Sequence, residues 1–369
     1  MLFRAEIFAK FVHSLRMKQL GMKEKSKKNQ GKRKGWLITA GIILIIVVTA
    51  IICLKKYAVD SFTDHAFFLY IRPNTTYQEL LDTLKTKVDK NTYLRFRRMS
   101  RLDDYERKMR PGAYRLDPSM SAVDVYKILS RGLQSPVRFS FNNIRTPQQF
   151  AKRTSDQLMM DSAEVMQLFA DTAFIHEAGF TQENFEAMLL PDSYEFYWTI
   201  SPEELFKRMK KEYDRFWTDE RRDKATAMGF TPVEISIVAS IAEEETNDKK
   251  ERGVVGRLYL NRLQINMPLQ ADPTIKFALQ DFSLRRILNQ HLLVESAYNT
   301  YKYAGLPPGP IRIPTKQTID AILNSEPHSY IYMCAKEDFS GRHNFATSFS
   351  QHQQNAARYR KALNQRNIR

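Results

Sequence analysis

The longest apolar stretch of the chain lies near its N-terminus, at residues 36–54, which read WLITAGIILIIVVTAIICL. These nineteen positions hold no charged residue, and their only hydroxyl side chains are two threonines. At a rise of about 1.5 Å per residue, such a helix nearly crosses a hydrocarbon core of about 30 Å. A buried core helix would normally carry more polar residues over this length. The pattern therefore favours a transmembrane helix.

A cleaved signal peptide is the main alternative for this segment. The apolar core of a signal peptide usually has about 7–15 residues and leads into small residues at the cleavage site. Here the run is longer, and Lys55 and Lys56 follow it. The lysine-rich segment KEKSKKNQGKRKG precedes it, so the positive-inside rule predicts that residues 1–35 form a basic cytoplasmic tail. Residues 57–369 would then lie outside the cytoplasm.

The first twenty residues allow two interpretations. Phe8, Phe11 and Leu15 among basic neighbours are compatible with an amphipathic helix lying on the membrane surface. Alternatively, translation starts at Met17 or Met22 rather than at Met1. The pattern leaves both open.

Two strand-and-helix units follow the anchor. The segment FFLYIRPNTTYQELLDTLKTK predicts a short strand, a turn, a Thr cap and a helix with three leucines facing inward. RPGAYRLDPSMSAVDVYKILSRG predicts a second strand and a Ser-capped helix with Asp124 at the third helical position and a terminal glycine. We therefore predict a small α+β module at residues 65–138. It is either a packing spacer or a carbohydrate-binding unit resembling LysM modules.

Residues 139–230 are predicted to form a helical connecting region. Within it, residues 189–198, LLPDSYEFYW, are expected to form a loop rich in aromatic residues. Asp192 and Glu195 among these rings would suit a sugar, whose apolar face stacks on aromatics and whose hydroxyls take hydrogen bonds. Alternatively, the aromatic rings simply fill the core.

A capped helix is predicted to begin near residue 231. Thr231 caps it, Pro232 occupies the first turn, and Glu234 completes a capping box. The helix continues as ISIVASIAEEET and ends in three consecutive glutamates.

The helical period separates these glutamates. At about 100° per residue, Glu245 lies about 80° from Ile237, within the apolar stripe of Ile237, Ile241 and Val238. Glu243 lies nearly opposite, at about 240°, and Glu244 lies at the edge, at about 340°. A carboxyl in an apolar stripe is desolvated, which raises its pKa and suits it to act as a general acid. The alternative is that EEE is a solvated acidic patch.

Composition and charge narrow the choice of function. Hydrophobic residues make up 43% and charged residues 27% of the 369 positions, which is typical of a globular body. The net charge of +16 would fit nucleic acid, but residues 1–56 alone carry +11, leaving +5 for the rest. We therefore expect no nucleic-acid partner. Cys53 and Cys334 offer no disulfide framework.

Motifs for cofactor chemistry are not evident. The sequence shows no His/Cys cluster at metal-ligand spacing, no phosphate-binding loop and no G-x-S-x-G elbow. We expect neither a metal nor an organic cofactor.

Three segments in the C-terminal half resemble a known family. ERGVVGRLYLNRLQINMPLQADPTIKFAL, then YNTYKYAGLPPGPI, then GRHNFATS are similar to the successive motifs of the endolytic murein transglycosylases, called MltG or YceG-like. The resemblance is specific over residues 231–353 and looser back to about residue 65. The family motif reads approximately A-S-I-[IV]-E-K-E-T, with catalysis at its second glutamate. Here the segment is A-S-I-A-E-E-E-T, so the resemblance assigns catalysis to Glu245.

This resemblance implies an α+β protein with one N-terminal transmembrane helix, a LysM-like module and a mixed α/β catalytic domain at residues 231–360. It implies an endolytic lytic transglycosylase that cleaves the MurNAc–GlcNAc bond of nascent peptidoglycan strands, leaves 1,6-anhydroMurNAc ends and could terminate glycan elongation. The protein would cross the inner membrane once, with its catalytic part in the periplasm. The sequence leaves open whether peptidoglycan synthases are partners.

The candidate site follows from the same motifs. Asp272 precedes Pro273, which disfavours helical backbone before the proline. Donors and acceptors in the other motifs suit hydroxyl and N-acetyl groups. The expected substrate-binding residues are Gln270, Asp272, Thr274, Asn299, Tyr301 and His343. Where the family has a basic or polar residue, Glu244 adds a negative charge, which we expect to raise the pKa of Glu245 further.

Two other functions remain open on the sequence. A muramidase-type hydrolase would use a second carboxylate, either Asp272 or Asp192. A membrane-tethered protein that binds peptidoglycan without cleaving it would use none of the glutamates chemically.

Overall fold

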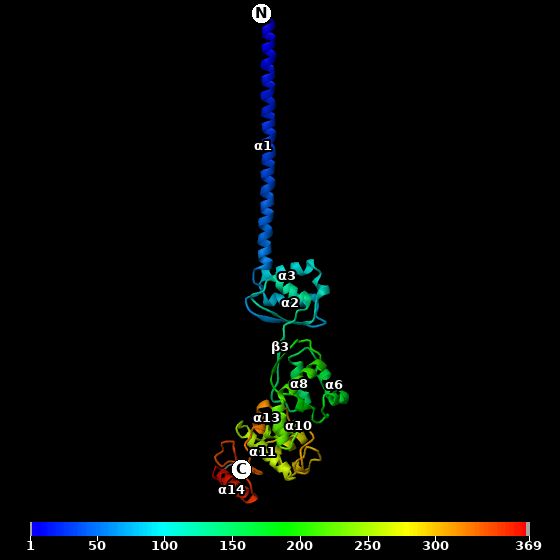
Figure 1. Ribbon diagram of the computed structural model, residues 1–369, viewed down its shortest axis with the longest axis vertical. Coiled ribbons are helices and arrows are strands. Elements are labelled where there is room, and N and C mark those ends of the chain that lie inside the picture. The colour runs from blue at the N-terminus through cyan, green and yellow to red at the C-terminus, as the bar shows by residue number, and fades with distance from the viewer. Residues whose placement is uncertain (1, 367–369) are drawn as a thin grey trace. The chain divides into compact units, whose positions relative to one another are not determined.

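The structure is a computed structural model that describes the backbone of residues 2–366 and the side chains of residues 16–20, 22 and 36–366. It divides into two compact units, Met1–Gln134 and Ser135–Arg369, which we describe separately (Figure 1). Helices and short antiparallel strands occur in both units, which confirms the α+β class.

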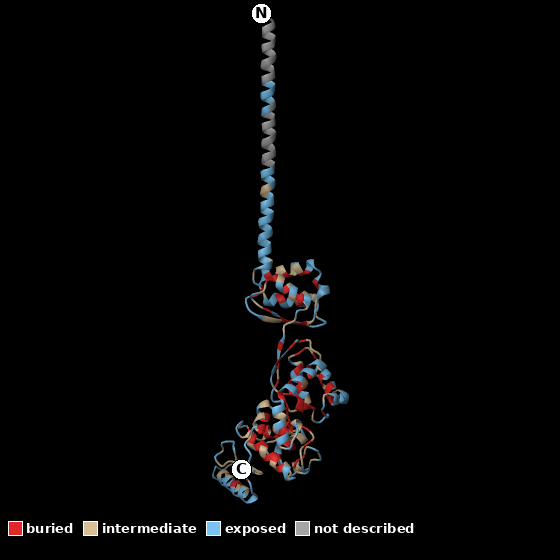
Figure 2. Cartoon of the chain, viewed as in Figure 1, coloured by how far each residue is buried: buried red, intermediate tan, exposed pale blue. Residues whose placement is uncertain are grey.

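Helix α1 spans Leu2–Ala58 and contains the predicted apolar run. Its segment Trp36–Ala58 is long and apolar enough to cross a membrane, and none of it is buried against protein. Figure 2 shows this segment as largely exposed, and its other residues, Ala40, Gly41 and Tyr57, are of intermediate burial. The described side chains of the apolar run 36–54 are therefore not packed into a protein core, as in a membrane anchor. The side chains of Phe8, Phe11, Leu15 and the lysine-rich flank lie outside the described residues.

The rest of the first unit contains both predicted strand-and-helix pairs and an additional helical segment. Its elements are β1 (Phe67–Ile71), α2 (Tyr77–Lys87), α3 (Lys90–Leu102), the 3-10 helix η1 (Tyr105–Lys108), β2 (Gly112–Leu116) and α4 (Ala122–Arg131). Strands β1 and β2 pair antiparallel, with Phe67 opposite Leu116 and Ile71 opposite Gly112. The sequence pattern did not predict α3, which is strongly basic and buries only a narrow face.

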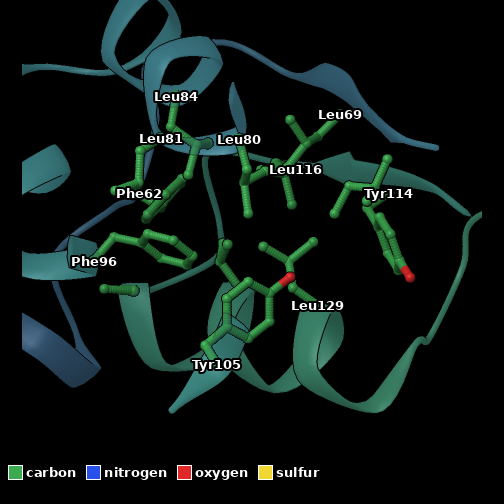
Figure 3. Packing of buried hydrophobic residues seen from close by; sticks show 13 residues of the cluster. Phe62, Leu69, Leu80, Leu81, Leu84, Phe96, Tyr105, Tyr114, Leu116 and Leu129 are labelled. Atoms are coloured by element: carbon green, nitrogen blue, oxygen red, sulfur yellow. The ribbon is translucent and has the colours of Figure 1, made fainter. Parts of the chain in front are cut away.

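Local capping explains where these helices begin and end. Thr76 and Glu79 form a capping box at α2, and Ser121 and Asp124 form one at α4. Gly132 ends α4 with φ 69°, a left-handed conformation that favours glycine. The predicted inward leucines of α2 join a core that also contains aromatic residues from other elements (Figure 3).

The second unit begins with a strand and a group of helices. Its first elements are β3 (Val137–Ser140), α5 (Pro147–Ser155), α6 (Ser162–Ala170), α7 (Thr172–Glu177), η2 (Phe185–Met188), β4 (Ser193–Phe196) and α8 (Pro202–Phe216). Strand β4 pairs antiparallel with β3, so the predicted loop at residues 189–198 is in part a strand. Tyr194, Phe196 and Trp198 are buried in the core. Residues 193–196 form a strand because they pair with β3, which lies more than fifty residues earlier in the sequence, although the local sequence predicts a loop.

The remaining elements of the second unit include one central helix and the helices that pack against it. They are α9 (Asp219–Ala227), α10 (Pro232–Glu245), α11 (Arg252–Gln264), α12 (Asp272–Leu279), η3 (His291–Leu293), α13 (Lys316–Leu323), β5 (Tyr332–Ala335), β6 (His343–Ala346) and α14 (Phe349–Gln365). Helices α9 and α10, bent by 77° relative to each other, are together long and apolar enough to cross a membrane. However, α10 packs against α11, α12 and α13 as a core helix.

Two glycines allow α11 to approach α13 closely. A Cβ at Gly253 would lie 2.5 Å from the carbonyl oxygen of Ala321, and one at Gly256 would lie 2.4 Å from Ile322. Only glycine therefore fits at these two positions. The same helix carries Tyr259 and Arg262, so this contact helps to place both side chains beside α10.

Candidate active site

Helix α10 brings Glu245 to a pocket at its C-terminal end. The predicted capping box is present, with the Thr231 N–H donating to Glu234 at 2.7 Å. From Ile235 to Glu243 every residue is buried. The helix is thus enclosed on all sides rather than along one apolar stripe. Of its three terminal glutamates, Glu245 lines the pocket.

The pocket has a volume of about 240 Å³ and is built from widely separated parts of the sequence. Five predicted residues line it: Glu245, Gln270, Asp272, Tyr301 and His343. The sequence reasoning missed the other lining residues, which are Tyr259 and Arg262 of α11 and Met333, Cys334 and Ala335 of β5.

The carboxyl group of Glu245 has the environment of a proton donor. Burial raises its pKa to about 7, and the nearby Asp272 carboxylate also raises it. The Tyr259 hydroxyl donates a hydrogen bond to Oε1 at 2.7 Å, which lowers the pKa, as does the positive charge of Arg262. Near neutral pH both protonation states are therefore accessible, which suits a group that first gives and then takes a proton.

Asp272 is oriented by a tyrosine. It is the first residue of α12, and the Tyr301 hydroxyl donates to its Oδ1 at 2.6 Å. The pKa of Tyr301 is raised by burial and by this carboxylate, so the phenol stays protonated and remains a donor. Asp272 thus presents a negative charge in the same pocket as Glu245.

Arg262 ties the pocket walls together. Its Nε donates to the carbonyl of Ile331 at 2.6 Å, and its Nη1 donates to that of Leu269 at 2.7 Å. The guanidinium therefore bridges the segment before β5 to the segment that carries Gln270. Burial lowers the pKa of Arg262, but the group starts from about 12.5 and stays charged at neutral pH.

His343 is held by a carboxylate that the sequence analysis did not identify. Its Nδ1 and its backbone N–H both lie 3.0 Å from Glu251 oxygens, one on each. With Glu251 ionised, Nδ1 carries the proton and donates, which leaves Nε2 as the ring nitrogen available to a ligand. Carboxylate and imidazole are both largely buried. No local pattern could reveal this pair, because its members lie about ninety residues apart in the sequence.

Two predicted substrate-binding residues do not line the pocket. Thr274 is buried, and its hydroxyl bonds the Ala271 carbonyl and the Thr300 hydroxyl at 2.7 and 2.9 Å. Asn299 is also buried, and its amide nitrogen donates to the carbonyls of Leu292 and Val294, both at 2.9 Å. Their polar groups are used within the fold, where they shape the segments that carry Asp272 and Tyr301.

The other two glutamates at the C-terminal end of α10 form ion pairs. Glu243 is buried, pairs with Arg252 at 2.9 Å and accepts the Thr315 N–H at 2.9 Å. The wheel placed Glu243 opposite the apolar stripe, but the structure encloses that side as well.

Glu244 pairs with Arg145 and Arg312 at 2.9 and 2.7 Å. The expectation that Glu244 raises the pKa of Glu245 is therefore wrong, because two guanidinium groups compensate its charge. The carboxylate that raises this pKa is Asp272.

Asp192, the alternative second carboxylate, lines a different cavity. It pairs with Lys316 at 2.6 Å, and this ammonium group lowers the pKa of Asp192. Among the residues whose side chains are described, no group of three or more His, Cys, Asp and Glu converges as metal ligands would.

Comparison with known proteins places this sequence in a family. The model of the YceG-like family matches residues 69–358. An endolytic murein transglycosylase of Bacillus subtilis (strain 168) is 30% identical over 182 residues, which are 49% of this chain and 49% of that protein. One of Streptococcus pneumoniae serotype 2 is 24% identical over 281 residues, covering 68% of this chain and 51% of that protein. The chain therefore spans about half the length of the curated relatives it matches.

A crystal structure of a YceG-like protein from Listeria monocytogenes is also similar. It shares 24% identity and a TM-score of 0.49, and the match covers 79% of this chain and 99% of that one. Since the family model matches well over half of the sequence, from the first strand of the first unit into α14, the chain belongs to the YceG-like family.

Proposed function

We propose that this protein is an endolytic peptidoglycan lytic transglycosylase with Glu245 as its catalytic acid and base. The observation that carries the proposal is a carboxyl group with a pKa of about 7 that opens to a pocket and accepts a hydrogen bond from Tyr259. The matched relatives from B. subtilis and S. pneumoniae are named endolytic murein transglycosylases.

In the proposed reaction, protonated Glu245 first donates its proton to the glycosidic oxygen between MurNAc and GlcNAc. The C1–O bond breaks, and the GlcNAc hydroxyl leaves. The Glu245 carboxylate then takes the proton of the muramoyl C6 hydroxyl while that oxygen bonds to C1, which closes a 1,6-anhydro ring. No water is consumed, and Glu245 ends protonated as it began. The C6 hydroxyl outcompetes water because it belongs to the same sugar as the reacting carbon.

The pocket residues support this chemistry in separate ways. Tyr259 holds the carboxyl group, and its hydrogen bond favours the ionised form that accepts the second proton. Asp272 opposes that ionisation and would stabilise positive charge developing on the sugar ring. We propose that Gln270, Tyr301 and His343 bind the glycan directly, whereas Thr274 and Asn299 shape the walls.

A muramidase-type hydrolase is the second candidate, because Asp272 shares the pocket with Glu245. In a hydrolase, Asp272 would activate water or attack the sugar, and two carboxyl groups in one site are what that chemistry uses. Asp192 is the weaker choice, since Lys316 neutralises it in another cavity.

Product analysis separates these functions. Purified full-length protein in detergent is incubated with isolated glycan strands, and the new ends are identified by mass spectrometry. Anhydro ends internal to long strands are expected with the wild type, and none with Glu245→Gln. Reducing ends would establish the hydrolase instead. Binding without any cleavage would indicate that the protein binds peptidoglycan at the membrane and is not an enzyme.

We also propose how the remaining parts serve this activity. Residues 36–58 would cross the inner membrane once, with residues 1–35 in the cytoplasm and the catalytic region, residues 231–360, in the periplasm. The small module at residues 65–138 would act as a LysM-like glycan-binding unit, and residues 139–230 would connect it to the catalytic region. The enzyme would act on nascent strands near the membrane and so end their elongation, with synthases as candidate partners.

A further inference from the structure

A second cavity in the same unit has no part in the reaction proposed above. It has a volume of about 450 Å³, and its walls come from β3 and the residues after it, α5, the start of β4 and the start of α13. The charged side chains in its lining are Arg138, Arg153 and Asp192. We call it the arginine cavity.

The two guanidinium groups decide the charge of this cavity. Lys316 pairs with Asp192 at 2.6 Å and so compensates the one acidic group of the lining. Arg138 donates to the neutral Ser193 hydroxyl at 2.8 Å, and Arg153 forms no ion pair with any residue whose side chain is described. Glu195 lies opposite Arg138 in the β3–β4 register, yet no ion pair joins them. The cavity therefore presents two positive charges without carboxylate partners.

Neutral hydrogen-bonding groups surround these charges. Asn142 and Gln317, which carry side-chain amides, and the hydroxyl residues Ser140 and Thr315 also line the cavity. A guanidinium group presents paired N–H donors that match the two oxygens of a carboxylate. The lining thus suits an extended polar ligand that carries carboxylates.

The arginine cavity adjoins the same end of α10 as the candidate active site. Thr315 lines the cavity, and its N–H donates to Glu243 at 2.9 Å. Glu243 and Glu245 lie two residues apart and therefore point to nearly opposite sides of the helix. The two cavities therefore lie toward nearly opposite sides of this end of α10. One polymer strand could contact both.

We infer that the arginine cavity binds a carboxylate of the peptides attached to the glycan, so that the enzyme prefers peptide-bearing strands. The inference rests on the proposed function, because peptidoglycan is the polymer in which sugars and carboxylate-bearing peptides alternate along one strand. Its Arg138 and Arg153 determine substrate preference and do not touch the reacting bond.

The test compares two substrates with full-length protein in detergent. One is intact peptide-bearing glycan, and the other is the same glycan after an amidase has removed the peptides. Replacing Arg138 or Arg153 with Gln is expected to raise KM for the peptide-bearing strands about two- to fivefold each, as for an exposed ion pair. The double variant should lose more. Neither kcat nor the KM for peptide-free glycan should change.

Matched variants separate a specific contact from a general charge effect. Lys211→Gln removes one exposed positive charge from α8, outside both cavities, and should leave both KM values unchanged. Arg153→Glu should weaken binding of peptide-bearing strands more than Arg153→Gln. High salt should reduce the difference between these variants, because an exposed charge contact is screened.

The outcomes distinguish failure of this inference from failure of the proposed function. Equal KM changes on both substrates, or no change on either, would overturn the role of the arginine cavity. If the wild type cleaves neither substrate, the proposed function fails. Binding of a soluble disaccharide-peptide to the same variants then tests the cavity alone. Binding of inorganic phosphate but not of this disaccharide-peptide would overturn the assignment to a peptide carboxylate.

Discussion

Two glutamates of the second unit have strongly raised pKa values, yet they differ in access. Burial raises the pKa of Glu245 to about 7 and that of Glu186 to about 8. Glu245 opens to the pocket and is hydrogen-bonded by Tyr259. Glu186 is buried in η2, and its Oε1 has no hydrogen-bond partner in the structure. Comparing substitutions of Glu245 and Glu186 therefore distinguishes the effect of a buried carboxyl group on stability from the effect of a pocket-lining carboxyl group on catalysis.

Glu245→Gln is expected to stabilise the protein while abolishing cleavage. A carboxyl group whose pKa rises on folding costs no stability below about pH 4.5, and the cost grows as the pH rises to about 7. At pH 8 the variant should therefore gain about 1–3 kcal/mol. Thermal unfolding at pH 4 and pH 8 measures this, at about 2–4 °C per kcal/mol for a unit of this size.

Glu186→Gln is the matched control for this prediction. It should show a similar gain at pH 8 and retain cleavage, because Glu186 does not line the active-site pocket. If both variants lose activity, the loss follows from replacing a buried carboxyl group and does not assign catalysis to Glu245.

Two neighbours of Glu245 should move its pH profile in opposite directions. Tyr259→Phe removes a hydrogen bond that lowers the pKa of Glu245, so the fall of kcat/KM on the basic side should shift to higher pH. Asp272→Asn removes a like charge, so that fall should shift to lower pH. Rate measurements between pH 5 and 9 test both. If both variants shift the basic-side fall of kcat/KM in the same direction, a group other than Glu245 controls that fall.

At the scale of elements, α10 uses its three terminal glutamates for three different purposes. Glu243 joins the helix to α11 and to the cap of α13, Glu244 joins it to two arginines, and Glu245 opens to the pocket. Because helical geometry points successive residues in different directions, three identical side chains meet three different environments.

Glu243→Gln is expected to destabilise the second unit by about 3 kcal/mol, because it leaves the largely buried Arg252 without its carboxylate. Unfolding measurements test it, with Glu234→Gln as the control, since glutamine also completes a capping box. The pH profile of the folded variant should match that of the wild type. An unchanged stability would mean that the ion pair contributes little net free energy.

At the scale of the whole molecule, the anchor determines where the enzyme can work. The apolar segment Trp36–Ala58 and its lysine-rich flank predict a cytoplasmic N-terminus. A reporter fused after Arg369 should be active only when it is exported. A matched fusion after Gly35, before the apolar segment, should be active only in the cytoplasm. Cytoplasmic activity of the C-terminal fusion would contradict both the orientation and access to the cell wall.

Short-range features were predictable from the sequence alone. The caps at Thr76, Ser121 and Thr231 and the apolar run of α1 depend on residues within a few positions of one another, so a local pattern contains them completely. The assignment of Glu245 followed from the motif around it, whereas the helical period did not separate Glu245 from Glu243, because the structure encloses both sides of α10.

Only the tertiary structure decided which groups meet. Tyr259 reaches Glu245 because glycines let α11 pack closely against α13, and Glu251 reaches His343 across about ninety residues. Asn299 turned inward because its amide satisfies carbonyl groups of its own loop. These contacts depend on how whole helices and strands pack, and such packing brings together residues whose local sequence patterns carry no information about each other.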